Sequence, residues 1–185
     1  MKNFITNRTV LSLSVAAAAM VFATQVVADD ITEAEVLAAQ QAWGGAVVML
    51  SEHYEEGGID KARDSARDVI DAAYGYDMGS VLFKPTLAPI PQNIRTTADG
   101  ALAYFVGHDD NFPADDGFGI KGWTEVEFEN AAIRLAGPVA LTMGNVHFTH
   151  KDGSVTTVDK SFGYQRGEDG NLRIVLHHSS LPFGS

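Results

Sequence analysis

The stretch ALTMGNVHFTHKDGSVTTVDKSFGYQR, residues 140–166, decides the fold class. Residues 140–149 and 155–166 lie in a region where apolar and polar side chains alternate with a period of two, as they do in a β-strand. Between them, Lys151-Asp152-Gly153 is a hairpin signal, because glycine tolerates the backbone geometry of a tight turn. The segment therefore predicts two long antiparallel strands joined by a hairpin.

The same period extends to both sides of this hairpin. Upstream, from Trp123 onward, Val126 and Phe128 alternate with three glutamates. Downstream, residues 168–171 form a turn, and residues 172–180 read as a last strand. Residues 81–84 predict one further short strand, which the prolines after it end.

The N-terminal half has helical spacing instead. A capping box at residues 32–35 begins a helix that runs to about Tyr54 and is stopped by Gly57-Gly58. Two more helices are predicted, one capped by Asp60 and running to about Tyr74, and a shorter one capped by Thr96 or Thr97 and ended by Gly107. The sequence thus predicts an α+β fold in which three N-terminal helices pack on a cone-shaped, curved antiparallel sheet. A site would lie at the open end of the cone.

Residues 1–28 read as a secretory signal peptide. Lys2 and Arg8 precede the uncharged run Val10–Phe22, and the small residue Ala28 precedes the expected cleavage point. The run is shorter than the roughly 20 apolar residues of a membrane span. We therefore expect an exported, periplasmic protein with no membrane segment in its mature form, although a Gram-positive secretion route fits the same signal.

The mature chain, residues 29–185, has the length of a single domain. Cleavage removes two cations and no acids, so the net charge falls from −11 to −13. Such an acidic body does not bind nucleic acid or anionic lipid by electrostatics. The chain has no cysteine, which excludes disulfides, thiolate chemistry and cysteine-based metal sites.

The last strand carries the candidate chemistry. Side chains alternate along a strand, and the face that lacks Arg173 is the more apolar one, so we assign it to the inside of the cone. That face ends in His178 and Ser180, whereas His177 and Ser179 lie on the other. The alternative is that these are ordinary polar residues at a strand end.

The run RIVLHHSSLP, residues 173–182, resembles the closing strand of the iota-class carbonic anhydrases. Further stretches resemble that family in the same order: GSVLFKPT (79–86, with Ser80 departing from the pattern), ALAYFVG (101–107), FENAAI (128–133), MGNVHFT (143–149) and FGYQR (162–166). The resemblance implies the nuclear-transport-factor-like cone that is also found in the association domain of calcium/calmodulin-dependent kinase II. It also implies reversible hydration of carbon dioxide to bicarbonate.

The resemblance further implies a pocket lined by threonine, tyrosine, histidine and serine. Carried over residue by residue, the catalytic set is Thr86, Tyr104, His178 and Ser180. His177 and Ser179 are the second, substrate-binding pair, since the register of the two pairs is open by one residue. Hydroxyls can orient a water and hold substrate oxygens, and a histidine can relay a proton near neutral pH.

A metal-free mechanism is expected. The sequence has no His-x-His pair, and the adjacent His177 and His178 point to opposite faces of a strand. The loop cluster His108-Asp109-Asp110 could hold a hard cation through oxygen, but we favour a solvated acidic loop. No metal ligand is therefore assigned, and zinc or manganese stays open.

Two other functions use the same fold class. A ligand-binding or isomerase pocket needs a carboxylate base inside the cone, whereas the predicted pocket strand carries histidine and serine. A non-catalytic oligomeric association module needs no pocket chemistry at all. A homodimer or larger homo-oligomer is expected alongside any of these functions, because a long sheet with one apolar exposed face favours self-association.

Overall fold

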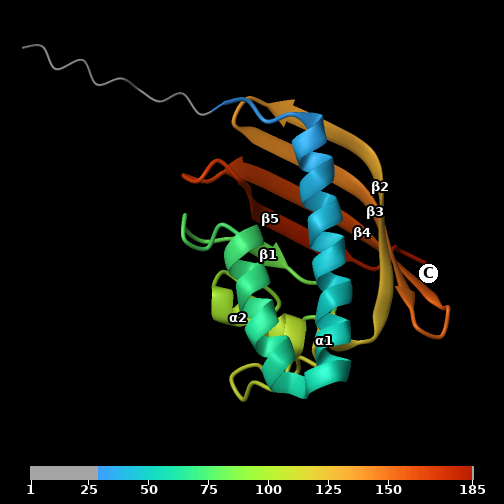
Figure 1. Ribbon diagram of the computed structural model, residues 1–185. Helices are drawn as coiled ribbons and strands as arrows, with labels where there is room; N and C mark the ends of the chain where they lie inside the picture. The colour runs from blue at the N-terminus through green and yellow to red at the C-terminus, as the bar shows by residue number, and fades with distance from the viewer. Residues whose placement is uncertain (1–28, 185) are drawn as a thin grey trace, which may run out of the picture.

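The structure is a computed structural model that describes residues 29–184 (Figure 1). The elements follow in the order α1 (Glu33–Ala73), β1 (Leu82–Lys84), α2 (Ala98–Val106), the short 3-10 helix η1 (Phe118–Ile120), β2 (Trp123–Ala136), β3 (Val139–His150), β4 (Val155–Arg166) and β5 (Leu172–Ser180). The helices precede a meander of long strands, so the predicted α+β class is confirmed. The predicted signal peptide, residues 1–28, lies outside the described residues.

The helix ends follow the capping residues of the sequence. At the start of α1, the Thr32 hydroxyl accepts a hydrogen bond from the backbone N–H of Glu35, whose carboxylate accepts one from the Thr32 N–H. Gly58, with φ of 70°, breaks the helical geometry, so α1 consists of two helical arms that correspond to the first two predicted helices. Thr97 caps α2 and Gly107 ends it.

The five strands form one sheet in the order β1-β5-β4-β3-β2. Strands β2 to β5 pair antiparallel, whereas β1 lies parallel to β5 at the edge. A bulge in β2 near Asn130 lies opposite Gly144 of β3. A Cβ at position 144 would collide with the backbone carbonyl of Glu129, so glycine is what allows the two strands to come this close at the bend.

The helices cover one face of the curved sheet, and the core lies between the two layers (Figure 1). Trp43 of α1 meets the rings of Phe148 and Phe162 edge-on, with ring centroids 6.2 and 5.6 Å apart. Phe83 of β1 stacks on Phe105 of α2 at 6.0 Å. This aromatic core forms the wall of the cavity described below.

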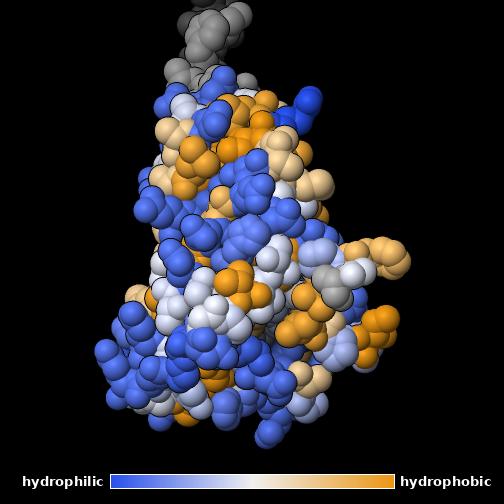
Figure 2. Space-filling model, turned by 90° about the vertical axis from the view of Figure 1, so that its right-hand side faces the viewer, coloured by the Kyte–Doolittle hydropathy of each residue, from blue (hydrophilic) through white to orange (hydrophobic). Residues whose placement is uncertain are grey.

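The outer face of the sheet carries an apolar row. Leu82, Leu176, Gly163 and Leu141 pair in register across β1, β5, β4 and β3, and Leu82 and Leu141 are 59% and 45% exposed. Figure 2 shows the side of the molecule that lies at the right in Figure 1, where β2 runs. Apolar side chains gather near the upper end of this side. Within residues 29–184, no helix combines the length and the apolar character that crossing a membrane requires.

Candidate active site

An extra residue in β5 sets which of its polar side chains point inward. Tyr164 of β4 pairs with Ile174 and Gly163 pairs with Leu176, so Val175 forms a bulge. One extra residue reverses the alternation of the strand beyond it. After the bulge, the inward positions are held by His177 and Ser179, which are 2% and 1% exposed.

This register corrects the expectation that His178 and Ser180 face the cone. His178 is exposed and Ser180 is half-buried, and neither lines the cavity. The alternation of Leu172, Ile174 and Leu176 in the sequence suggested an unbroken strand, and the bulge at Val175 breaks it. The structure brings together the other predicted pair, His177 and Ser179.

The inward side chains of β5 meet the helices and β1 around a small cavity of about 10 Å³. This is about the space in which one water molecule fits. Its apolar wall consists of Trp43, Phe83, Pro85, Phe105 and Phe118. Its polar lining consists of Thr86, Tyr104, Lys160, His177 and Ser179.

Thr86 and Ser179 are joined directly. The Thr86 hydroxyl donates a 2.6 Å hydrogen bond to the Ser179 hydroxyl. Nearby, Lys84 Nζ donates to the Ser179 backbone carbonyl at 2.9 Å. These contacts fix the end of β5 against the segment that follows β1, so both hydroxyls are held at the cavity wall.

Tyr104 projects from α2 toward the same place. Burial raises the pKa of its hydroxyl to about 12, and hydrogen bonding with the Thr86 side chain and with the backbone of Leu87 and Thr86 offsets part of the rise. The phenol is therefore a neutral donor and acceptor at physiological pH. Thr86, Tyr104 and Ser179 together place three hydroxyls on one small volume.

His177 belongs to a buried hydrogen-bond chain. Its Nδ1 lies 2.9 Å from the hydroxyl of Tyr74, which accepts a hydrogen bond from Trp43 Nε1 at 3.0 Å. Its Nε2 lies 3.1 Å from Lys160 Nζ. Burial first, and then the charge of Lys160, hold the pKa of His177 well below its usual value, so the ring is neutral at pH 7.

Lys160 is the functional candidate that sequence reasoning missed. The inward positions of β4 are Val158, Lys160, Phe162 and Tyr164, and all four are buried. A single lysine in an apolar series with period two was the available signal, since lysine is rarely fully buried. Within residues 29–184, Lys160 is the one lysine or arginine in the cavity lining.

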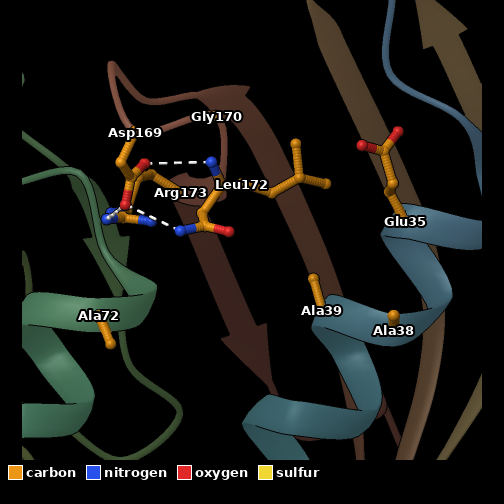
Figure 3. Close-up of a pocket in the computed structure, with 9 residues that line it drawn as sticks. Glu35, Ala38, Ala39, Ala72, Asp169, Gly170, Leu172 and Arg173 are labelled. Atoms are coloured by element: carbon orange, nitrogen blue, oxygen red, sulfur yellow. Dashed lines mark hydrogen bonds and ion pairs between the residues drawn. The ribbon is translucent and has the colours of Figure 1, made fainter.

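A larger hollow of about 490 Å³ lies elsewhere, at the turn between β4 and β5 (Figure 3). Its charged side chains are already paired, because Asp169 bonds Arg173 at 2.7 Å and Glu35 bonds Arg166 at 2.8 Å. The close-up shows the Asp169 side chain turned toward Arg173 and its own turn, with alanines lining the helical side. It contains none of the predicted site residues.

The described residues offer no cluster of metal ligands. Within residues 29–184, no three histidine or acidic side chains come together in a way that could hold an ion. In the loop cluster, His108 Nδ1 lies 3.2 Å from the Val106 carbonyl, and Asp109 accepts hydrogen bonds from Asn111. These side chains stabilise their own loop.

Comparison with known proteins identifies the family. The family model for metal-independent carbonic anhydrase matches residues 34–181. A curated metal-independent carbonic anhydrase from Nostoc sp. (strain PCC 7120 / SAG 25.82 / UTEX 2576) is 54% identical over 160 residues, covering 86% of this chain and 78% of the relative. Because the matched family is metal-independent, the prediction of a metal-free protein is confirmed.

Solved structures agree. The iota-carbonic anhydrase from a cyanobacterium, crystallised with bicarbonate, superposes with a TM-score of 0.84 and 54% identity, covering 88% of this chain and 99% of that one. A putative calcium/calmodulin-dependent kinase II association domain from Xanthomonas campestris covers 88% of this chain and all of its own at 21% identity, with a TM-score of 0.52, and shows the shared fold alone. The chain therefore belongs to the metal-independent, iota-class carbonic anhydrases, as its resemblance predicted.

Proposed function

We propose that this carbonic anhydrase hydrates carbon dioxide reversibly to bicarbonate in the cavity lined by Thr86, Tyr104, His177 and Ser179. The observation that carries the proposal is the convergence of three hydroxyls on a small cavity with an aromatic wall. The bicarbonate in the related cyanobacterial structure supports the choice of substrate.

The chemistry needs positioning more than activation, because carbon dioxide is already electrophilic. The apolar rings of Trp43 and Phe83 offer the gas a dry surface. The hydroxyls can each donate and accept, so the Thr86–Ser179 pair can orient a water and then hold a bicarbonate oxygen. Tyr104 stays protonated and can donate to an oxygen that gains negative charge.

His177 takes the place that the sequence analysis gave to His178. Its two ring nitrogens face Tyr74 and Lys160, so the ring holds its neighbours in position. Its lowered pKa makes imidazolium a poor intermediate at neutral pH. His177 therefore acts as a positioning residue, and the proton relay expected of a histidine falls to another group.

The isomerase alternative lacks its base. Within the described part of the chain, no carboxylate lines the cavity. Asp115, which lines a separate pocket together with Tyr104, accepts hydrogen bonds on both of its oxygens from Arg95 Nη2 at 2.7 and 2.8 Å. A pure association module would leave the part-buried Thr86–Ser179 pair and the buried Lys160–His177 pair without a use.

Hydration of carbon dioxide by stopped flow tests the proposal. We expect the wild type to be active and Tyr104→Phe to lose about tenfold or more, since one donor at the developing charge is removed. Tyr76→Phe is the matched control, because the Tyr76 hydroxyl bonds the Arg95 carbonyl outside the cavity. An inactive wild type, or equal rates in the two variants, would contradict the proposal.

Self-association and export complete the proposal. The apolar row Leu82–Leu176–Gly163–Leu141 on the outer face supports a homodimer or larger homo-oligomer, because a second copy of the chain can cover an exposed apolar row.

The composition of residues 1–28 supports cleavage after Ala28 and a periplasmic location. N-terminal sequencing of the periplasmic protein that begins elsewhere than Asp29 would contradict that cleavage site.

A further inference from the structure

Lys160 is a buried amine that has no acidic partner in the described part of the chain. Its side chain is on β4, and the residue is 5% exposed. Within residues 29–184 it forms no ion pair, and its polar neighbour is His177 Nε2 at 3.1 Å. The rings of Trp43 and Phe148 surround the amine, with centroids 4.4 and 5.2 Å from Nζ. Burying an unpaired charge is costly, so a purely structural role would favour an apolar side chain here.

We propose that Lys160 is a catalytic base of this reaction: its amine, held by His177 at the cavity wall, accepts the proton that the attacking water loses. The inference rests on the proposed function, because the amine lines the same cavity as Thr86 and Ser179. It also gives the Lys160–His177 contact a purpose, since His177 Nε2 keeps the amine aimed at that wall.

The other polar groups of the cavity are poor acceptors for this proton. Thr86 and Ser179 are alcohols, which do not hold a second proton near neutral pH. The Tyr104 phenol already carries its proton, and its pKa is raised to about 12. The pKa of His177 lies well below its usual value. Burial lowers the pKa of Lys160 to about 7, where a general base is most effective.

The step conserves charge inside the cavity. The water oxygen forms a bond to the carbon of carbon dioxide, and one C–O π pair moves onto oxygen. The proton leaves the water for the lone pair of Lys160 Nζ. A neutral amine, water and carbon dioxide thus become an ammonium and a bicarbonate, and their opposite charges compensate each other in a poorly solvated space. In dehydration, the ammonium returns the proton. After bicarbonate leaves, water that refills the cavity carries the proton to solvent.

The groups that face Lys160 set the pH at which it titrates. His177 faces it from β5, with Tyr74 of α1 behind that ring, and Tyr104 lies across the cavity on α2. Strand β3, α1 and η1 contribute the rings of Phe148, Trp43 and Phe118. All three titratable neighbours are neutral between pH 6.5 and 9, so the hydration rate should follow the single titration of Lys160.

The test is the pH profile of kcat/KM for hydration between pH 6 and 9.5, measured by stopped flow on protein expressed from the full chain. Wild type should rise to a plateau with a midpoint near pH 7. Lys160→Met should lose about 10²-fold or more at the plateau, together with that midpoint, because a general base contributes about 10²–10⁴-fold. Lys160→Arg should be equally slow, since arginine keeps its charge. Lys151→Met, on an exposed lysine paired with Glu55, is the matched control.

Chemical rescue separates base catalysis from a structural role. Lys160→Ala should recover rate in proportion to added methylamine, whereas a protein that merely folds badly would not. The inference is overturned if folded Lys160→Met keeps the wild-type rate and midpoint, or if methylamine has no effect on an otherwise slow Lys160→Ala. An active wild type with a slow Ser179→Ala and an unaffected Lys160→Met would reject the base and keep the proposed function. An inactive wild type would reject both.

Discussion

The hydroxyl of Thr86 donates a 2.6 Å hydrogen bond to the hydroxyl of Ser179, which lies 93 residues later in the chain. The two meet because β1 runs parallel to β5, with Phe83 opposite His177 in the register. The short edge strand therefore positions Thr86, which follows it, at the polar wall of the cavity. The bulge at Val175 supplies the other condition, because it turns His177 and Ser179 inward.

The register of β5 can be tested with a pair of neighbouring serines. Ser179→Ala removes a buried hydroxyl at the cavity and leaves Thr86 without its acceptor, so the hydration rate should fall by about 10²-fold. Ser180→Ala alters a half-buried position outside the cavity and should keep the rate within about twofold. Stopped-flow assays of both variants decide the matter. If Ser180→Ala is the slower variant, Ser180 and not Ser179 faces the cavity, and β5 alternates without a bulge.

The neighbouring residues His177 and His178 allow a similar test of the register of β5, with the free energy of unfolding as the measured quantity. His177→Phe leaves the Tyr74 hydroxyl and the Lys160 amine without their ring partner, and each unsatisfied buried group costs about 1–3 kcal/mol. His178→Phe changes an exposed side chain and should alter the free energy of unfolding by less than about 0.5 kcal/mol. Urea denaturation measures both. Equal losses would show that the buried chain is not a source of stability.

Lys160 should give the protein a stability that depends on pH. Its pKa falls from 10.5 to about 7 on folding, so between these values the unfolded chain binds more protons than the folded one. The free energy of unfolding of the wild type should therefore rise from pH 7 to pH 10 relative to that of Lys160→Met. At pH 7 and below, Lys160→Met should be the more stable protein. If the difference in the free energy of unfolding between the two proteins, measured by urea denaturation, stays constant from pH 7 to pH 10, the amine is not buried as the structure shows.

The outer apolar row predicts how the protein assembles. Leu141 lies in the row and is 45% exposed, so Leu141→Glu should place a charge in the proposed contact between copies and lower the oligomeric mass. Val155→Glu, at an exposed position beside the β3–β4 hairpin, is the control. Light scattering at micromolar protein concentration measures the oligomeric mass of both variants. A monomeric wild type at that concentration would reject self-association.

Most of the fold could be predicted from local patterns. The strands at residues 155–166 and 172–180 were predicted to their ends, because alternation and the turn residues that bound it are local signals. The threonine pair Thr96-Thr97, of which Thr97 is the cap, and the glycine at 107 likewise marked the two ends of α2. At Gly58 the glycine signal also marked a real break, since the backbone there is not helical and α1 bends into two arms.

The site could be predicted only in part, for a physical reason. A bulge depends on how two paired strands fit together, so the sequence of residues 172–180 contains no local signal for the extra residue Val175. The sequence analysis therefore assumed an unbroken strand and placed His178 and Ser180 inward. The resemblance to a known family supplied Thr86 and Tyr104, which the cavity contains. Lys160 was readable in principle, as a charged residue in the inward series of β4, and was missed.

The central claim is that this carbonic anhydrase works at the Thr86–Ser179 cavity without a metal. The most direct measurement is stopped-flow hydration of carbon dioxide by wild type and Ser179→Ala, each before and after treatment with a chelator. The account predicts that the wild-type rate survives chelation and that Ser179→Ala is slow in both conditions. Activity that disappears on chelation and returns with zinc or manganese, or a Ser179→Ala variant as fast as wild type, would contradict it.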